Sequence, residues 1–121
     1  MCGPNTTAPL ILKRLNKMNI SIDFDDTYTR DPDLWTAFAQ DAIERGHNVY
    51  CVTLRMPEQG KDVLETIGRV IGSGMCYFTS MQSKKRYMWE HGIRIDVWID
   101  DMPDAIVYGI DTHVNNGVIF P

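Results

Sequence analysis

The stretch Ile20-Ser21-Ile22-Asp23-Phe24-Asp25-Asp26-Thr27 is an apolar, β-branched run that ends abruptly in carboxylates. Runs of this kind are typical of buried strands. In α/β proteins the carboxyl ends of the strands form the edge of the sheet at which ligands bind. The stretch therefore predicts an α/β fold with acidic side chains at its ligand-binding edge.

Three aspartates of this stretch, Asp23, Asp25 and Asp26, are expected to converge on one small volume. Two like charges about 4 Å apart repel each other by roughly 4 kcal/mol at an effective dielectric constant of about 20, unless a cation or a proton lies between them. A hard divalent cation with oxygen ligands relieves this repulsion. The sequence therefore predicts a metal site at the end of the first strand.

The composition is that of an ordinary globular domain. The chain has 121 residues, which is room for one domain around a single core. Hydrophobic residues make up 44% and charged residues 23%, which excludes collagen-like, disordered and membrane-spanning classes. No apolar run approaches the length of a bilayer span, so no membrane partner is expected. The net charge of −4 argues against broad attraction to a nucleic-acid backbone.

Cysteine usage and the first residues bear on location and domain organisation. Cys2, Cys51 and Cys76 contain no C-x-x-C pair and leave one thiol unmatched, so neither a disulfide framework nor a zinc site is expected. A reducing, cytoplasmic location suits them. Residues 1–17 lack the charge order of a secretory signal. We expect them to be a disordered extension that precedes a single domain over residues 18–121.

The rest of the chain alternates helices with strands after a first strand expected at 19–24. Asp31 and Pro32 mark the start of the first helix, and Gly46 marks its end. Alternation of this kind predicts a parallel sheet with right-handed crossovers. Helices are expected at 32–45, 63–71 and 83–91, strands at 48–54, 75–78 and 95–99, and either a last strand or a helical turn at 105–110, while 113–121 receives no assignment.

The other strand ends also carry polar residues that can take part in chemistry. Thr53 ends the second strand, and Asp100 and Asp101 follow the last one. Lys84 and Lys85 come after the third strand, at the start of the third expected helix. Because the carboxyl ends of parallel strands lie at one edge of a sheet, these side chains are expected to meet the first aspartates.

Each residue type suits one task in phosphoryl transfer. Asp23 could attack phosphorus as a carboxylate nucleophile, forming an aspartyl-phosphate that divides a slow hydrolysis into two easier displacements. Asp25 could protonate the leaving oxygen and later activate water. The hydroxyl of Thr53 and a lysine ammonium could hold the non-bridging oxygens. Asp23, Asp25, Asp100 and Asp101 are the candidate ligands of Mg²⁺.

Some assignments remain open on the sequence alone. Lys84 is the first choice for the phosphate-binding lysine because it begins the helix, and Lys85 is the alternative. Thr27 and Arg55 are candidate substrate contacts, although Arg55 could equally be a solvated loop residue. Either Asp100 or Asp101 could be the direct metal ligand.

The four motifs in this order resemble those of the haloacid dehalogenase-like superfamily of phosphatases and phosphotransferases. The segments that carry the resemblance are 20–27, 49–53, 83–85 and 97–101. The resemblance implies a three-layer, Rossmann-like parallel sheet with helices on both faces. It also implies that the first aspartate is the nucleophile, the second the general acid and base, and that the threonine and lysine bind phosphate.

The spacing between the motifs bears on the substrate. The intervals hold only a helix, or a helix and a strand, so we expect no cap domain and an open site. In this superfamily cap-less members tend to act on exposed phosphate groups, so the resemblance implies a phosphorylated partner such as a nucleotide or a polynucleotide end. Oligomeric state is not indicated.

Two other classes compete with a phosphatase. A phosphoacceptor module of the response-regulator type also groups aspartates, a threonine and a lysine around magnesium. In such modules the lysine comes last, whereas here Asp100 and Asp101 follow Lys84. The second alternative is a catalytically silent protein that keeps only the metal site.

Overall fold

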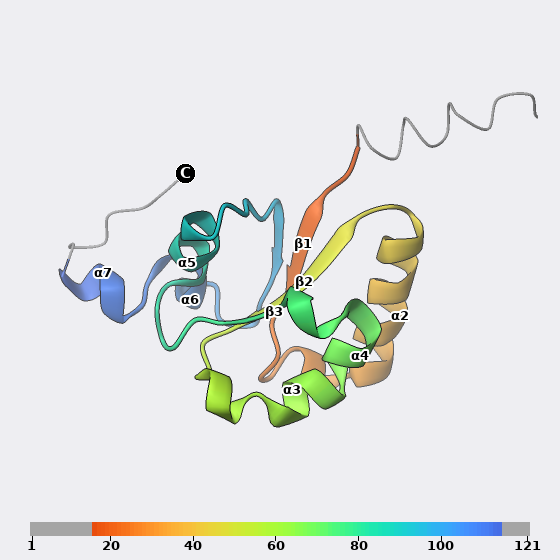
Figure 1. Cartoon of the computed structure of the whole chain (residues 1–121), viewed down its shortest axis with the longest axis horizontal. Coiled ribbons are helices and arrows are strands. Elements are labelled where there is room, and N and C mark those ends of the chain that lie inside the picture. Colours follow the sequence, from red (N-terminus) through yellow and green to blue (C-terminus); the bar gives the residue numbers. More distant parts are fainter. Residues whose placement is uncertain (1–15, 115–121) are drawn as a thin grey trace, which may run out of the picture.

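The computed structural model describes residues 16–114, which form a parallel sheet of four strands with helices against it (Figure 1). The strands are β1 (Asn19–Ile22), β2 (Asn48–Thr53), β3 (Cys76–Phe78) and β4 (Val97–Ile99), in the spatial order β3-β2-β1-β4. The helices are α2 (Pro32–Glu44), α3 (Lys61–Glu65), α4 (Ile67–Ile71), α5 (Lys84–Glu90), α6 (Asp104–Val107) and α7 (Ile110–Val114). Short 3₁₀ turns are η1 (Tyr28–Arg30), η2 (Pro57–Gln59) and η3 (Ser73–Met75).

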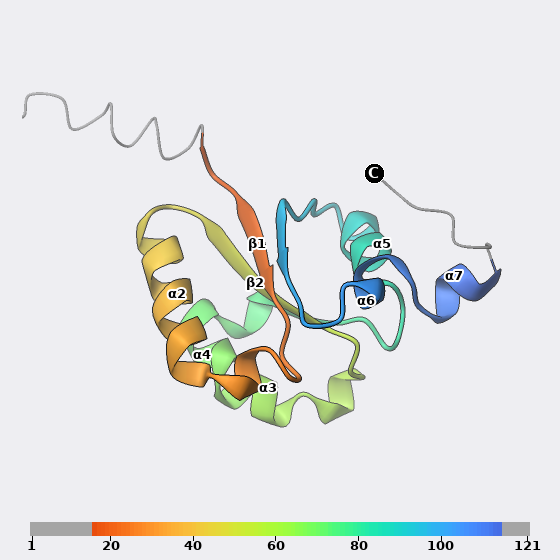
Figure 2. The same ribbon diagram turned by 180° about the vertical axis from the view of Figure 1, so that it is seen from behind.

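Both faces of the sheet are covered. Along β2 the side chains alternate, so that Val49 and Cys51 pack with α2, α3 and α4 while Tyr50 and Val52 pack with Met88 of α5. Figures 1 and 2 show α2, α3 and α4 on one side of the sheet and α5 and α6 on the other. The α/β fold with an all-parallel sheet is thus confirmed, in a Rossmann-like arrangement of three layers.

The expected second helix, 63–71, is wrong as a single helix. It is interrupted at Thr66, whose φ of −113° and ψ of −96° are not helical. The Thr66 hydroxyl donates to the carbonyl of Asp62 at 2.6 Å, a local bond of the kind that competes with helix continuation. The stripe of apolar residues is kept across the break, because Val63 and Ile67 are both fully buried.

Other boundaries differ in smaller ways. The last strand begins at Val97 rather than at Ile95. Within 105–110 the chain forms the end of α6, leaves the helix at Tyr108 and Gly109, and enters α7 at Ile110, so the helical-turn alternative is confirmed and the strand alternative is wrong. Residues 1–15 of the expected extension over 1–17, and residues 115–121 of the unassigned 113–121, fall outside the described residues. Within 16–114, no helix is long and apolar enough to cross a membrane.

Candidate functional site

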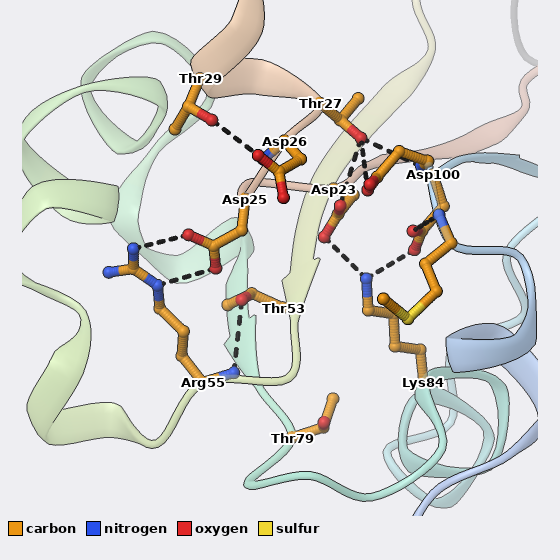
Figure 3. A network of polar contacts seen from close by, with 12 residues as sticks. Asp23, Asp25, Asp26, Thr27, Thr29, Thr53, Arg55, Thr79, Lys84 and Asp100 are labelled. Atoms are coloured by element: carbon orange, nitrogen blue, oxygen red, sulfur yellow. Dashed lines mark hydrogen bonds and ion pairs between the residues drawn. The ribbon is translucent and has the colours of Figure 1, made fainter.

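The carboxyl ends of β1, β2 and β4 and the start of α5 meet around one small depression, which we call the acidic hollow. Its volume is about 100 Å³. Figure 3 shows Asp23 and Lys84 pointing toward each other, with Thr53 nearby. The residues with functional groups around it are Asp23, Asp25, Asp26, Thr53, Lys84, Asp100 and Asp101. The sequence-predicted residues that border it therefore come from all four motifs.

The backbone around Asp23 turns sharply and aims its side chain into the acidic hollow. The Asp23 N–H donates to the carbonyl of Ile99 at 2.9 Å, and its own carbonyl accepts from the N–H of Tyr28 at 3.1 Å. Asp26 has a φ of 64°, a left-handed conformation that aspartate tolerates better than most residues. Its N–H donates to the Thr29 hydroxyl at 2.9 Å, which holds the turn.

Lys84 is buried, with 2% of its surface exposed, and its ammonium joins two carboxylates. Lys84 Nζ lies 2.8 Å from Asp23 Oδ1 and 2.5 Å from Asp100 Oδ2. A buried ammonium is stable only when it is paired in this way. Lys85 instead borders a separate depression with Trp89 and Trp98, so of the two candidate lysines only Lys84 borders the acidic hollow.

The start of α5 is fixed by the C-terminal part of the described chain. The carboxylate of Asp111 accepts hydrogen bonds from the Ser83 N–H at 2.8 Å and from the Ser83 hydroxyl at 3.0 Å. Gly109 permits this approach, because a Cβ there would lie 2.3 Å from the Ser83 nitrogen. Neither residue stood out in the sequence, since a contact across so many residues leaves no local pattern.

Three carboxylates form a group suited to a metal ion. Oxygens of Asp23, Asp100 and Asp101 lie within 4.8 Å of one another. The Thr27 hydroxyl lies 3.2 Å from both Asp23 Oδ2 and Asp101 Oδ1, and it also accepts from the Asp101 N–H at 3.1 Å. Thr27 was expected to contact substrate, but it is buried and its hydroxyl orients two carboxylates instead.

The carboxylates of this group have different pKa shifts. Burial raises the pKa of Asp23 to about 6, against the lowering effect of Lys84, and the hydrogen bond with Asp101 raises it further. The same hydrogen bond, followed by that from Thr27, lowers the pKa of Asp101. The two opposite pKa shifts follow from the close approach of Asp23 and Asp101, which a proton or a cation would relieve. Hard oxygen donors in this number and spacing fit Mg²⁺.

Asp25 is not part of this group of three carboxylates, and its expected role as a metal ligand stays a prediction. Its two oxygens form a bidentate pair with Arg55, Oδ1 to Nη2 at 2.7 Å and Oδ2 to Nε at 3.0 Å (Figure 3). Arg55 Nη1 also donates to Asp62 at 2.6 Å and to the Gln59 carbonyl at 2.7 Å. The hydrogen bonds with Asp25, and after them the one with Asp62, raise the pKa of Arg55.

Arg55 was a candidate substrate contact, yet its guanidinium is occupied within the chain. It also lies over the ring of Phe24, 4.9 Å from the ring centre. Thr53, which is 1% exposed, accepts the Arg55 N–H at 3.3 Å and can donate its own O–H into the acidic hollow. The pairing of Arg55 with Asp25 was not predicted from the sequence, and the expected phosphate and substrate contacts of Thr53 and Arg55 stay predictions.

Comparison with protein-family models, with curated proteins and with solved structures finds no match. What the acidic hollow can do must therefore be inferred from the chemistry of its own side chains.

Proposed function

We propose that the protein is a Mg²⁺-dependent phosphomonoester hydrolase of the haloacid dehalogenase-like type that acts through an aspartyl-phosphate on Asp23. The observation that carries the proposal is the buried ammonium of Lys84 between Asp23 and Asp100, beside the hydroxyl of Thr53. One positive charge, one hydroxyl donor and one buried carboxylate are the groups that phosphoryl transfer to an aspartate requires.

The first half-reaction uses the chain's own groups as follows. A carboxylate oxygen of Asp23 forms a bond to phosphorus, and the bond from phosphorus to the leaving oxygen breaks with its electrons on that oxygen. Lys84 and Thr53 hold the non-bridging oxygens as charge moves onto them. Asp25, whose side chain is 53% exposed, leaves Arg55, takes up a proton from solvent, and passes that proton to the leaving oxygen.

The second half-reaction restores the enzyme. Asp25 accepts a proton from a water molecule whose oxygen attacks phosphorus, and the bond to Asp23 breaks to give inorganic phosphate. Asp23, Asp100 and Asp101 would hold Mg²⁺, which supplies positive charge against the phosphate and the three carboxylates.

The open surroundings of the acidic hollow support substrates with exposed phosphate groups. Only η1 and α2 lie between Thr27 and β2, so no cap domain is inserted there, and short helices and β3 fill the interval before α5. Nucleotides and polynucleotide ends are the substrates that the superfamily resemblance implies. A cytoplasmic location agrees with the free thiol of Cys51 in the core.

The experiment compares release of inorganic phosphate from an aryl phosphate, with and without Mg²⁺, by wild type and Asp23→Asn. Asp41→Asn on the exposed side of α2 is the matched control, because it makes the same chemical change away from the acidic hollow. We expect Mg²⁺-dependent turnover in wild type and the control only. Equal rates for wild type and Asp23→Asn would show that Asp23 is not the nucleophile.

The engagement of Asp25 by Arg55 favours one second candidate, a phosphoacceptor module. Such a module needs no general acid. In this structure Asp25, the proposed general acid, is paired with the guanidinium of Arg55. Acid quenching after exposure to acetyl phosphate distinguishes the two. A phosphoryl group that stays on Asp23 for minutes without release of phosphate supports the module, and rapid release supports the hydrolase.

A further inference from the structure

A second depression, which we call the apolar hollow, adjoins the acidic hollow. Its volume is about 470 Å³, within the range of about 300–1,000 Å³ that is usual for small-molecule sites. Leu54, Met102 and Ala105 border both hollows, so the two adjoin. The other apolar side chains around it are Met81, Tyr108 and Ile110.

Large apolar side chains are exposed around this hollow to an unusual degree. The exposed fractions are 52% for Met81, 58% for Met102, 47% for Tyr108 and 61% for Ile110. Single exposed apolar residues are common, but a group of them around one concave surface marks a binding site. Met81 lies between β3 and α5 and the other three lie within residues 102–110, so the fold brings two segments of the chain together here.

The walls of the apolar hollow are held firmly in place. Ser80 and Met81 have φ values of 54° and 69°, a strained conformation for residues other than glycine. The Met81 N–H donates to the Leu54 carbonyl at 2.8 Å, and the Met81 carbonyl accepts from the Ile110 N–H at 3.0 Å. Backbone strain that surrounding hydrogen bonds maintain is concentrated at ligand-binding sites in proteins.

The two sides of the acidic hollow differ in charge. Toward Thr27 lies a depression of about 330 Å³ whose border carries three carboxylates against one guanidinium and one indole ring; these residues are Asp26, Asp100, Asp101, Arg30 and Trp35. Toward Leu54, Asp104 is the only carboxylate that borders the apolar hollow among the described residues. A phosphate ester is anionic, so further carboxylates repel it. An apolar substituent leaves water at no cost in hydrogen bonds when it packs against methionine and tyrosine side chains. The apolar side is therefore the better place for the rest of the substrate.

We propose that the apolar hollow receives an aromatic ring of the substrate's leaving group, so that the substrates are phosphomonoesters that carry such a ring. This rests on the proposed function, which puts the phosphoryl group in the acidic hollow. Tyr108 offers a face or edge for ring packing. Met81 and Met102 have flexible thioethers that adapt to rings of different shape. Nucleoside monophosphates belong to this class, whereas simple sugar phosphates do not.

The test measures binding rather than turnover. Calorimetry in Mg²⁺ compares benzylphosphonate with methylphosphonate, which share the phosphoryl mimic and differ in the ring. We expect wild type to bind benzylphosphonate roughly tenfold more tightly or better. Tyr108→Ala and Ile110→Glu should remove most of this preference. Ile43→Glu makes the same isoleucine-to-glutamate change at an exposed position near the end of α2, away from the apolar hollow, and should keep the preference.

The outcomes separate this inference from the proposed function. Equal affinities in wild type, or a preference that survives both Tyr108→Ala and Ile110→Glu, would overturn the aromatic-ring proposal even if phosphate esters are hydrolysed. A preference that both variants remove would support it even if no ester is hydrolysed, and the hydrolase proposal alone would then fail.

Discussion

At the scale of single residues, Asp23 combines burial with a negative charge. Its pKa of about 6 lies above the ordinary 3.8, so between these values the folded chain holds a proton that the unfolded chain has lost. The contribution of Asp23 to the free energy of unfolding without metal is therefore most favourable below about pH 4, falls as the pH rises toward 6, and stays low above it. The lowered pKa of Asp101 acts in the opposite direction, but only in more acidic solution.

The first prediction concerns Asp23→Asn, which resembles the protonated side chain. Without divalent metal near pH 7, we expect it to raise the free energy of unfolding by about 1–3 kcal/mol over wild type, because no carboxylate has to be buried. Near pH 4 the difference should disappear. Urea unfolding in a chelator measures both. A variant less stable than wild type at neutral pH would contradict the assigned cause of the pKa shift.

The second prediction concerns metal affinity. Because a proton on Asp23 competes with Mg²⁺, affinity should fall by about tenfold for each pH unit below about 6 and be nearly constant above 7. Titration calorimetry across this range measures the effect. Asp23→Asn should bind weakly and lose this dependence, and the same slope in wild type and variant would assign the proton to another group.

The third prediction separates the two neighbouring lysines. Lys84→Met leaves Asp23 and Asp100 close together without their shared ammonium, so we expect a loss of about 3–5 kcal/mol in unfolding free energy without metal. Lys85→Met should change it by less than about 0.5 kcal/mol. Chemical denaturation of both variants measures the difference, and equal losses would refute the buried-pair assignment.

At the scale of elements, the start of α5 depends on the segment between α6 and α7. Gly109→Ala would press a methyl group against the Ser83 backbone, whereas Gly74→Ala meets nothing within 4 Å. We expect the first change to lower the free energy of unfolding by about 1–3 kcal/mol and the second to be nearly neutral. Thermal melting measures both. Similar melting temperatures would mean that the C-terminal segment does not hold α5.

The elements that the sequence predicted correctly are those with a local signal. The helix after Pro32 has an aspartate cap and a proline in its first turn, and β2 is a long apolar run. The break at Thr66 was missed because the apolar stripe continues through it. The bidentate ion pair between Arg55 and Asp25 was missed because side-chain pairing between loops leaves no periodic pattern in the sequence.

At the scale of the whole molecule, parallel topology explains why the candidate residues could be found from the sequence. Strand ends in a parallel sheet lie at one edge, so Asp23, Thr53 and Asp100 could be assigned to one site without knowing the strand order. The order β3-β2-β1-β4 itself was not predicted, since pairing is non-local. The apolar hollow was not predicted either, because its walls come from segments far apart in the chain.

The hydrogen bonds from Ser83 to Asp111 have a consequence for biosynthesis. A ribosome that has made the sheet and α5 has not yet supplied the carboxylate that secures the helix start. We expect Lys84 to gain its final position only when Asp111 can accept these hydrogen bonds. We expect the nascent chain to stay inert toward phosphate until then, however early its strands have paired.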